Sequence, residues 1–318
     1  MSPSRHQPPQ SLLQIALQLD DAAVRRLLRL DALLAGMRRA LIDLSAGRVV
    51  QPLRLVMEIP AHQGLLFVKP ALTQDALITK LITQLPGNAA RGLPTMLATL
   101  VLMDPATGQT LAVMDATWLT ALRTAAVSAV GADALTPPGP KIVAMLGSGT
   151  LARSHAQALR AVRPISEIRV WSRNPANVAR CAQDVDGVAC ASAEAAVRGA
   201  DIVCTVTNAS EPVLKGTWLK AGAFVAAIGA VRPSWRELDD EAMRNVVVAD
   251  SREAAEKESG DVILSCAEVY AELGEILAGT KAPPPPGATV VFKAIGQAVA
   301  DAVAARLVYD AALSSSHA

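Results

Sequence analysis

The chain has 318 residues, which is enough for two domains of ordinary size. Its 30 lysines and arginines balance 29 aspartates and glutamates, and 3% of its residues are aromatic, so the composition argues against a protein that binds nucleic acid or a membrane surface by charge. The four cysteines show no metal-like clustering, and no apolar run reaches the roughly 18–20 residues that span a bilayer. We therefore expect a soluble, cytoplasmic protein with free thiols, no metal site and no membrane segment.

The first 136 residues contain three basic side chains in unusual surroundings. After a polar, proline-bearing start, which predicts a disordered N-terminus over residues 1–12, a first domain is predicted over 13–136. Within it, Arg54, Lys80 and Arg123 lie among apolar neighbours, where a charge has to be paired or functional. Taken singly, each is better explained as a surface base whose stem covers apolar surface.

A glycine-rich turn follows the first domain. Prolines in Thr136–Pro140 interrupt the helical pattern, and a short apolar run then leads into Gly147-Ser148-Gly149, after which apolar residues recur at helical spacing. In a strand-turn-helix unit of this kind, Gly147 permits the turn, Gly149 lets a ligand approach the backbone, and Ala152 lets the helix pack closely on the strand. Free N–H groups at the helix start suit a pyrophosphate.

Further strands extend this unit into a domain. They are predicted at 167–174, 200–208, 223–230 and 245–251, with a helical stretch at 178–184. Short apolar strands separated by helices indicate a Rossmann-type, doubly wound parallel sheet. We predict an NAD(P)-binding domain over 137–287, ending in a proline-rich segment. A strand and a long helix over 288–318 are then predicted to return to the first domain and complete its α+β fold.

The end of the second predicted strand of this domain bears on the cofactor. It reads Trp171-Ser172-Arg173-Asn174, without the acidic residue that usually binds a ribose 2′-hydroxyl in NAD sites. The guanidinium of Arg173 instead suits the 2′-phosphate of NADPH, through a forked, charge-assisted contact. The alternative is that Arg173 is merely solvated. We expect NADPH as the cofactor, with NAD less favoured.

The stretches LTALRTAAVSAV, MLGSGTLARSHAQAL, ADSREAAEKESGDVILS and VFKAIGQAVADAVAARLVYD resemble the ornithine cyclodeaminase/mu-crystallin family. The resemblance extends from about Leu19 to Tyr309. It implies an N-terminal substrate and dimerisation domain, a Rossmann domain, and an active site in the cleft between them. It also implies a homodimer that acts on a small imino or amino acid.

The resemblance also implies roles for individual residues. Lys80 is expected to be the catalytic residue, holding or protonating the imine nitrogen of the substrate, and Arg54, Arg123 and Glu258 are expected to contact the substrate as well. A helix-capping or salt-bridge role is equally plausible for Glu258. The residues implied to contact the cofactor are Arg123, Gly147, Ser148, Gly149, Thr150, Leu151, Ser172, Arg173, Asn174, Asn177, Thr207, Asn208, Ile228 and Lys293.

One loop position separates the activities of the family. Ornithine-cyclising members carry a catalytic aspartate after the late Rossmann strand, but in IGAVRPSW its place is taken by Val231, which cannot take a proton. We therefore expect a member of the mu-crystallin-like ketimine reductase branch, which reduces Δ1-pyrroline-2-carboxylate and Δ1-piperideine-2-carboxylate to proline and pipecolate with NADPH. Ala294 departs from the family's usual serine, which weakens any transfer of the thyroid-hormone binding of mu-crystallin to this chain. An ornithine cyclodeaminase, an alanine dehydrogenase-like enzyme and a non-catalytic NADPH- or ligand-binding protein remain alternatives.

Overall fold

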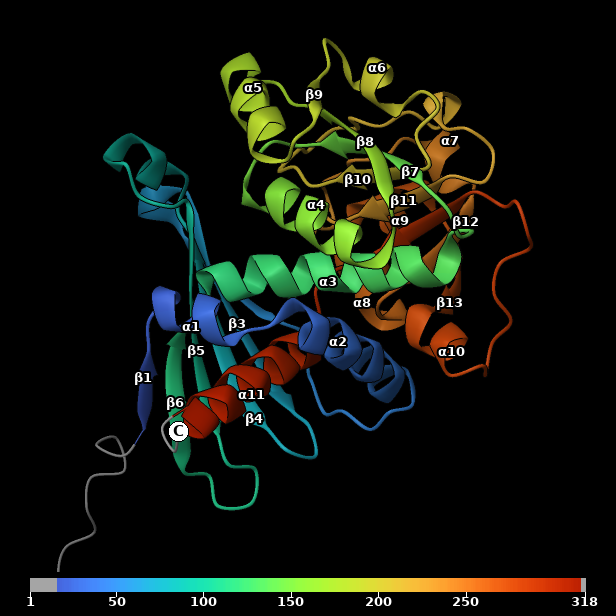
Figure 1. Ribbon diagram of the computed structural model, residues 1–318. Helices are drawn as coiled ribbons and strands as arrows, with labels where there is room; N and C mark the ends of the chain where they lie inside the picture. The colour runs from blue at the N-terminus through green and yellow to red at the C-terminus, as the bar shows by residue number, and fades with distance from the viewer. Residues whose placement is uncertain (1–15, 316–318) are drawn as a thin grey trace, which may run out of the picture.

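The computed structural model describes residues 16–315, which form two domains, each built around one β-sheet (Figure 1). The predicted disordered segment 1–12 lies outside the described residues. In Figure 1 the long helix α3 (Thr117–Leu135) crosses the middle of the molecule, with the other helices of the first domain below it and most of the sheet of the second domain above it. Within residues 16–315, no helix is both long and apolar enough to cross a membrane.

The first domain has a six-stranded sheet with helices on one face. Its strand order is β1-β6-β5-β4-β3-β2; the β1–β6 pair is parallel and the other pairs are antiparallel. The strands are β1 (Leu17–Leu19), β2 (Leu55–Ile59), β3 (Gly64–Leu72), β4 (Leu77–Gln84), β5 (Met96–Met103) and β6 (Thr110–Asp115), and the helices are α1 (Asp21–Leu27), α2 (Leu30–Ser45) and α11 (Ala298–Ser315), with short 3-10 turns at Pro60–His62 and Pro86–Arg91.

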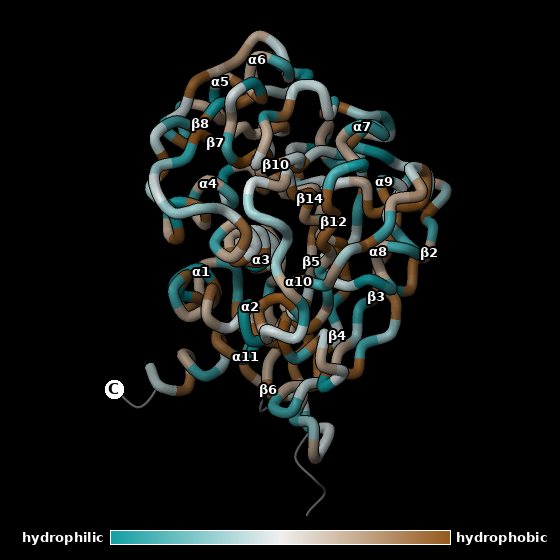
Figure 2. The backbone as a smooth tube through the Cα atoms, turned by 90° about the vertical axis from the view of Figure 1, so that its right-hand side faces the viewer, coloured by the Kyte–Doolittle hydropathy of each residue, from teal (hydrophilic) through white to brown (hydrophobic). Residues whose placement is uncertain are grey.

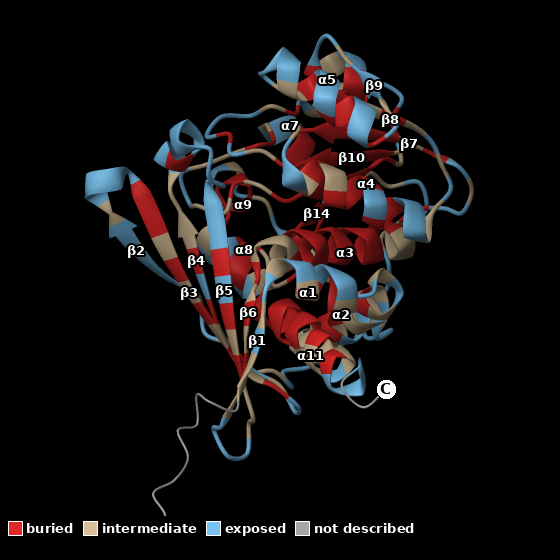
Figure 3. Cartoon of the chain, turned by 60° about the vertical axis from the view of Figure 1, so that its left-hand side comes forward, coloured by how far each residue is buried: buried red, intermediate tan, exposed pale blue. Residues whose placement is uncertain are grey.

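The sequence of β4 shows how this sheet separates its two faces. Ile78, Lys80 and Ile82 are buried, and α11 contacts the strand, whereas Leu81 is 39% exposed. This alternation follows from the two-residue period of a strand. Figure 3 shows α11 beside this sheet and exposed residues along β2 and β5. Lys80 therefore lies on the core side of the sheet, where most side chains are apolar.

The second domain has an eight-stranded, all-parallel sheet of the Rossmann type, which confirms the predicted fold class. Its strand order is β13-β12-β14-β11-β10-β7-β8-β9. The strands are β7 (Lys141–Leu146), β8 (Ile165–Trp171), β9 (Val188–Ala189), β10 (Ile202–Thr205), β11 (Phe224–Ala227), β12 (Val246–Ala249), β13 (Val269–Glu272) and β14 (Val290–Lys293). The helices are α4 (Thr150–Val162), α5 (Pro175–Asp184), α6 (Ala193–Val197), α7 (Asp240–Met243), α8 (Arg252–Glu258), α9 (Gly260–Ser265) and α10 (Leu273–Leu277), with a 3-10 turn at Gly216–Trp218.

Both faces of this sheet are covered, as the near-continuous apolar strands predict. On β7, Val143 and Met145 belong to one core cluster, and Ala144 and Leu146 belong to another. The order of the strands reverses between β7 and β10, because β8 and β9 extend the sheet on one side and the later strands extend it on the other. In a doubly wound sheet the ligand binds beyond the carboxyl ends of the strands at such a reversal.

The predicted domain boundary at 287/288 is wrong for the strand that follows it. Strand β14 pairs with β11 and β12, so it lies inside the second sheet and not in the first domain. The physical reason is that its residues Val290 to Lys293 are all buried and form a parallel-sheet core strand. Only after Gly296 does the chain return to the first domain, as helix α11.

Helix α3 joins the two domains and is buried on almost all sides. Seen nearly along its axis in Figure 2, it lies between α4 and the pair α1 and α2. Its small residues let neighbours approach closely: a side chain at Gly131 would come within 3.1 Å of Phe292. His155 of α4 is fully buried against α3, with 2.9 Å between its Nε2 and Ser128 Oγ, and burial lowers its pKa to about 4. We interpret His155 as a neutral packing residue.

Candidate active site

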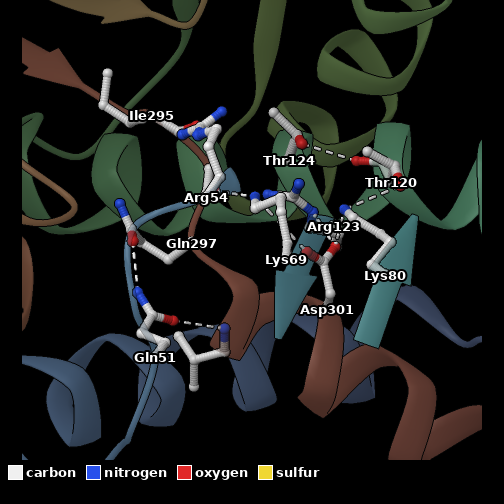
Figure 4. Close-up of polar contacts among 12 residues, drawn as sticks. Gln51, Arg54, Lys69, Lys80, Thr120, Arg123, Thr124, Ile295, Gln297 and Asp301 are labelled. Atoms are coloured by element: carbon white, nitrogen blue, oxygen red, sulfur yellow. Dashed lines mark hydrogen bonds and ion pairs between the residues drawn. The ribbon is translucent and has the colours of Figure 1, made fainter. Parts of the chain in front are cut away.

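Three chain segments bring opposite charges together beneath α3. Asp301, in the first turn of α11, is fully buried, with its Oδ1 2.5 Å from Lys80 Nζ and 2.7 Å from Arg123 Nε (Figure 4). Lys80 is also fully buried and donates a hydrogen bond to Thr120 Oγ1 at 3.3 Å. The structure thus brings together two of the predicted site residues, Lys80 and Arg123, and pairs both with a carboxylate that the sequence analysis did not identify.

Lys69 is a fourth member of this cluster and was also missed. Strands β3 and β4 pair antiparallel with Lys69 directly opposite Lys80, so both side chains lie on the same face of the sheet. Lys69 is 6% exposed; its Nζ donates to the carbonyl of Gly296 and lies 3.9 Å from Asp301 Oδ2. No periodicity distinguishes Lys69 from an ordinary strand residue; the only available signal was a lysine between apolar neighbours in FVKPA.

Burial and mutual repulsion change the protonation behaviour of these groups. Burial lowers the pKa of Lys80 to about 7, and the charge of Arg123 adds to this effect. Burial and the nearby Lys80 also hold the pKa of Lys69 well below its usual range. For Asp301, burial alone raises the pKa, but Arg123, Lys80 and Lys69 outweigh it and hold the pKa at about 2. Asp301 is therefore an ionised carboxylate at neutral pH. Lys69 and Lys80 lose their protons at a lower pH than a lysine in water does.

Arg54 and Glu258, both predicted to contact the substrate, form an ion pair at the edge of this cluster. The distance from Arg54 Nη2 to Glu258 Oε2 is 2.7 Å, and the same nitrogen donates to the carbonyl of Ile295 at 2.9 Å. The salt-bridge alternative for Glu258 is therefore what the structure contains. A cavity of about 230 Å³ adjoins the pair and is lined by Arg54, Glu258, Lys69 and Gln297, among others; Lys80 does not line it.

The cluster lies where the two domains meet. Ile295 and Gly296 follow β14 of the second domain and precede α11 of the first, and Arg54 and Lys69 of the first domain donate to their carbonyls. The same link is held from the other side by Asp250, which accepts from Gly296 N at 2.9 Å. The cluster therefore lies at the chain segment that connects the second domain to α11 of the first.

Several buried polar atoms of the cluster have no hydrogen-bond partner among residues 16–315. They are Nε and Nη1 of Arg123 and Oδ2 of Asp301. Arg123 Nε contacts Asp301 as an ion pair, but without the alignment of a hydrogen bond. Because a buried polar group without a partner is costly, such groups cluster where a ligand is bound. The donors are cationic, so an anionic ligand suits them.

The predicted pyrophosphate turn has the geometry that the sequence indicated. Gly147 follows β7 with a φ of +129°, and a side chain there would come within 2.7 Å of the carbonyl of Val206. Gly149 caps α4 with a φ of −87°, and a side chain there would meet no protein atom within 4 Å. Thr150 and Leu151 open helix α4. The turn therefore presents an open backbone at a helix start, which fits a pyrophosphate.

The predicted 2′-phosphate residues lie next to this turn. Ser172 Oγ, just past β8, is 2.7 Å from Ser148 Oγ, so the ends of β7 and β8 are adjacent. Arg173 is exposed. Asn174 caps α5 and accepts from Asn177 N at 3.2 Å. These positions fit a dinucleotide whose adenosine half lies across the ends of β7 and β8, with Arg173 at its solvent side.

The residues predicted near the nicotinamide are organised by a buried glutamate. Glu237 accepts four hydrogen bonds, from Thr205 Oγ1, from Thr207 N and Oγ1, and from Gly229 N, at 2.6 to 2.8 Å. It thereby fixes the segments after β10 and β11, in which Thr207, Asn208 and Ile228 lie. Sequence reasoning missed Glu237, because it lies in an irregular loop and no periodicity marks it.

Lys293, which was predicted to contact the cofactor, is paired with other groups inside the second domain. Its side chain is fully buried, its Nζ lies 2.8 Å from Asp261 Oδ2, and it also donates to the carbonyl of Gly229. Asp261 in turn accepts from the backbone N–H groups of Glu237 and Leu238. Lys293 therefore supports the loop after β11 from inside the domain. Val231, which follows in that loop, is half-buried.

Known proteins are similar to this chain in both sequence and fold. The model of the ornithine cyclodeaminase/mu-crystallin family matches residues 16–316. The ketimine reductase mu-crystallin of Mus musculus is 48% identical over 269 residues, which cover 83% of this chain and 86% of the mouse protein. The structure of Thermococcus litoralis Δ1-pyrroline-2-carboxylate reductase in complex with NADH and L-proline superimposes with a TM-score of 0.89 and 34% identity, covering 94% of this chain and 98% of that one.

An archaeal alanine dehydrogenase dimer with bound NAD also superimposes, with a TM-score of 0.88 and 30% identity, over 95% of this chain and 97% of that one. The similarity thus extends over both domains and the link between them, where the cationic cluster lies. The chain belongs to the ornithine cyclodeaminase/mu-crystallin family.

Proposed function

We propose that this protein is an NADPH-dependent reductase of cyclic ketimine carboxylates, converting Δ1-pyrroline-2-carboxylate and Δ1-piperideine-2-carboxylate to proline and pipecolate. The observation that carries the proposal is the cluster of four cations, Arg54, Lys69, Lys80 and Arg123, with two carboxylates, Asp301 and Glu258, at the junction with a dinucleotide-binding domain. An excess of cations over anions next to a cavity suits a small carboxylate substrate. Similarity to a ketimine reductase and to a Δ1-pyrroline-2-carboxylate reductase supports this assignment.

In the proposed reaction the nicotinamide supplies the hydride that reduces the C=N bond. The chain's own residues bind and orient the substrate. Arg54 and Arg123 attract its carboxylate, and a fixed orientation lowers the barrier because the reacting atoms no longer have to be brought together from solution. Lys80, with a pKa near 7, is the proposed donor of the proton that the imine nitrogen takes up, since a group of this pKa gives up a proton readily at neutral pH.

The loop after β11 argues for reduction over cyclisation of ornithine. Val231 occupies the position where ornithine-cyclising relatives carry their aspartate, and an isopropyl group can neither activate water nor accept a proton. Glu237, in the same loop, already accepts four hydrogen bonds, and Asp239 caps helix α7. Deamination by water would therefore lack its acid/base group.

The choice of NADPH over NADH is likewise proposed, on the exposed Arg173 at the end of β8. No acidic side chain occupies the turn from Trp171 to Asn174 to bind a ribose 2′-hydroxyl, and an exposed guanidinium there supports the proposed pairing with a 2′-phosphate. Ser172 and Ser148, whose hydroxyls are in contact, offer further donors beside it.

A direct assay tests the proposed function. Cyclic imine carboxylates of five- and six-membered rings are mixed with NADPH, and oxidation of the cofactor and formation of proline or pipecolate are followed. We expect both products, and no proline or ammonia from ornithine with NAD. Proline and ammonia from ornithine, with no oxidation of NADPH by the imines, would replace the proposal with a cyclodeaminase. A rate that requires a 2-oxo acid together with free ammonia would indicate an alanine dehydrogenase-like enzyme.

The same assay separates an enzyme from a protein that only binds its ligands. Lys80→Ala is expected to lower kcat at least a hundredfold, since general acid catalysis typically contributes about that factor or more. NADPH affinity should stay within a few fold, because Lys80 lies in the first domain. If wild-type protein binds NADPH and carboxylate tightly but shows no turnover that Lys80→Ala removes, the protein is a binder and not a reductase.

A homodimer is proposed as the working form. Strand β2 is the edge of the first-domain sheet and exposes Leu55, Val56 and Met57 at 58, 50 and 49%. An open, apolar sheet edge is a ready surface for pairing with another chain. The similar archaeal alanine dehydrogenase is a dimer. Light scattering should give twice the mass of the chain at micromolar concentration, and Val56→Lys should shift the mass toward the monomer; a monomeric wild-type protein would contradict this assignment.

A further inference from the structure

Lys69, and not Lys80, is the lysine that faces the cavity beside the cationic cluster. Lys69 lines that cavity together with Arg54, Gly296 and Gln297, whereas Lys80 lies behind it, held by Asp301 and Thr120. Both lysines project from the same face of the sheet, from directly paired positions on β3 and β4. Figure 4 shows Lys69 between Arg54 and Arg123. An ammonium in this position meets any anion that enters the cavity.

Lys69 has a long contact with its counter-charge. The nearest carboxylate oxygen, Asp301 Oδ2, is 3.9 Å away, and the other oxygen of Asp301 is in closer contact with Lys80 and Arg123. Its hydrogen bond goes to a neutral carbonyl, that of Gly296. A buried charge has to be paired or give up its proton, and among the three basic residues around Asp301, Lys69 has the most distant contact with the carboxylate.

We propose that Lys69 receives the carboxylate of the substrate, together with Arg54, and takes up a proton from solvent when the carboxylate binds. The chemistry of the ligand, a small carboxylate, rests on the proposed function. The placement of Lys69 does not. In this arrangement Lys69 is a neutral amine in the free protein, so its buried side chain carries no charge. When the carboxylate binds, its negative charge favours the protonated form of Lys69.

Every charged group that faces Lys69 acts on this proton. Lys80 on β4, Arg54 before β2 and Arg123 on α3 oppose protonation, and Asp301 on α11 favours it; burial opposes it most strongly, so the pKa of Lys69 lies well below the usual value. Three glutamates, Glu253, Glu258 and Glu272, also line the cavity, and Glu258 is paired with Arg54. A carboxylate bound between Lys69 and Arg54 adds a second negative neighbour and raises the pKa of Lys69.

This coupling predicts a definite pH dependence. The protonated form of Lys69 binds the anion, so the affinity is greatest below the pKa of Lys69 in the free protein and falls by about tenfold per pH unit above it. Over that range, binding is accompanied by the uptake of about one proton. An arginine at this position stays charged, so Lys69→Arg should bind without either effect.

The experiment uses the full chain saturated with NADPH, and pyrrole-2-carboxylate as a planar, non-reducible carboxylate probe. Titration calorimetry between pH 6 and 10, in buffers of different ionisation enthalpy, gives both the affinity and the number of protons taken up.

The wild type should take up about one proton when the probe binds. Lys69→Met should bind about 10- to 100-fold more weakly, as expected for loss of a charge-assisted contact, and without uptake. Lys69→Arg should keep most of the affinity and lose the uptake. Lys257→Met, an exposed lysine paired with Glu253, is the control and should match the wild type.

The outcomes separate this inference from the proposed function. Proton uptake that persists in Lys69→Arg would assign the proton to another group, with Lys80 the first candidate, and would overturn the inference, as would wild-type affinity in Lys69→Met or no binding of the probe to the wild type. Imine turnover by the wild type stands or falls separately. Probe binding that depends on Lys69, in a protein that reduces no imine, would sink the proposed function and leave the inference standing. If Lys69→Met did not fold, the pH slope of Lys69→Arg would still decide.

Discussion

Lys80 and Asp301 are 221 positions apart in the chain, yet they form a fully buried ion pair with 2.5 Å between Nζ and Oδ1. The pair fastens the central strand β4 of the first domain to the start of α11, the helix that follows the last strand of the second domain. Arg123, on the helix that joins the domains, contacts the same carboxylate oxygen. A single side chain of α11 therefore holds together the two basic residues on which the proposed chemistry depends.

Asp301→Asn should remove this anchor. Neutralising the carboxylate leaves Lys80 and Arg123 buried without a counter-charge, and breaking a buried pair typically costs about 3–5 kcal/mol. We expect a loss of that order in the free energy of unfolding, measured by urea denaturation at fixed protein concentration, and a fall in activity. Asp310→Asn on the same helix removes an exposed ion pair with Arg306 and should change stability by less than about 1 kcal/mol. Equal effects of the two substitutions would contradict the anchoring role.

Asp301 should also make the protein sensitive to acid. Its pKa is about 2 in the folded protein, below the ordinary aspartate value of 3.8, so the folded state binds this proton less readily than the unfolded state does. The resulting stability, about 2 kcal/mol, is present above pH 4 and is lost as the pH falls toward 2. Unfolding free energies measured from pH 6 to pH 2 should show this loss in the wild type. The loss should be reduced in Asp301→Asn, and an unchanged slope would assign the acid sensitivity to other carboxylates.

The two glycines of the pyrophosphate turn should separate folding from binding. In Gly147→Ala the new methyl would lie 2.7 Å from the carbonyl of Val206, at a φ of +129° that other residues rarely adopt, so stability should fall by at least about 1–3 kcal/mol. In Gly149→Ala the methyl meets open space, so the thermal midpoint without cofactor should hold or rise slightly. That methyl stands where the pyrophosphate approaches, so NADPH affinity should fall at least tenfold by fluorescence titration. Wild-type NADPH affinity in Gly149→Ala would argue against this turn as the cofactor site.

Arg173→Ala tests the preference for NADPH. A charged hydrogen bond to the 2′-phosphate is worth about 1.5–3 kcal/mol, which is roughly a ten- to hundredfold difference in affinity. NADPH binding should weaken by that factor and NADH binding should be nearly unchanged, because NADH has no phosphate to lose. Arg198→Ala, which removes an equal charge from an exposed pair with Glu194, controls for the net charge of the domain. Equal wild-type affinities for NADPH and NADH would remove the argument for NADPH.

Glu237→Gln tests whether the hydrogen bonds of Glu237 position the segments after β10 and β11. Each oxygen of Glu237 accepts one backbone N–H, that of Thr207 or that of Gly229. An amide can accept only one of them, so one buried N–H loses its acceptor whichever way the amide turns, at a cost of about 1–3 kcal/mol. We expect lower stability and weaker NADPH binding by calorimetry. Glu241→Gln, at an exposed position, should change neither stability nor NADPH binding. If Glu237→Gln also changes neither, Glu237 does not position these segments.

The sequence by itself determined what is local. A strand, a turn and a helix start are adjacent in the chain, so the apolar run to Leu146, the glycines at 147 and 149 and the helical spacing after Thr150 predicted the turn that the structure contains. Strands β7, β8, β10, β11 and β12 of the second domain were predicted for the same reason, because each is a short apolar run with breakers on both sides, whereas β9 and β13 were not predicted. Arg54, Lys80 and Arg123 stood out because a charge among apolar neighbours is unusual wherever the chain goes.

The tertiary structure decided which charges meet. Lys69 gained its position from strand register, which placed it opposite Lys80, and Asp301 gained its role from the return of α11 to the first sheet. The sequence around Lys69 and Asp301 contains no pattern that predicts which residue each of them contacts. Strand β14 was assigned to the wrong domain because its three apolar residues suit any buried strand, and its place was set by pairing with β11 and β12. Side-chain periodicity reports burial along one segment, whereas an active site is built from contacts between segments, and those are fixed only when the whole chain packs.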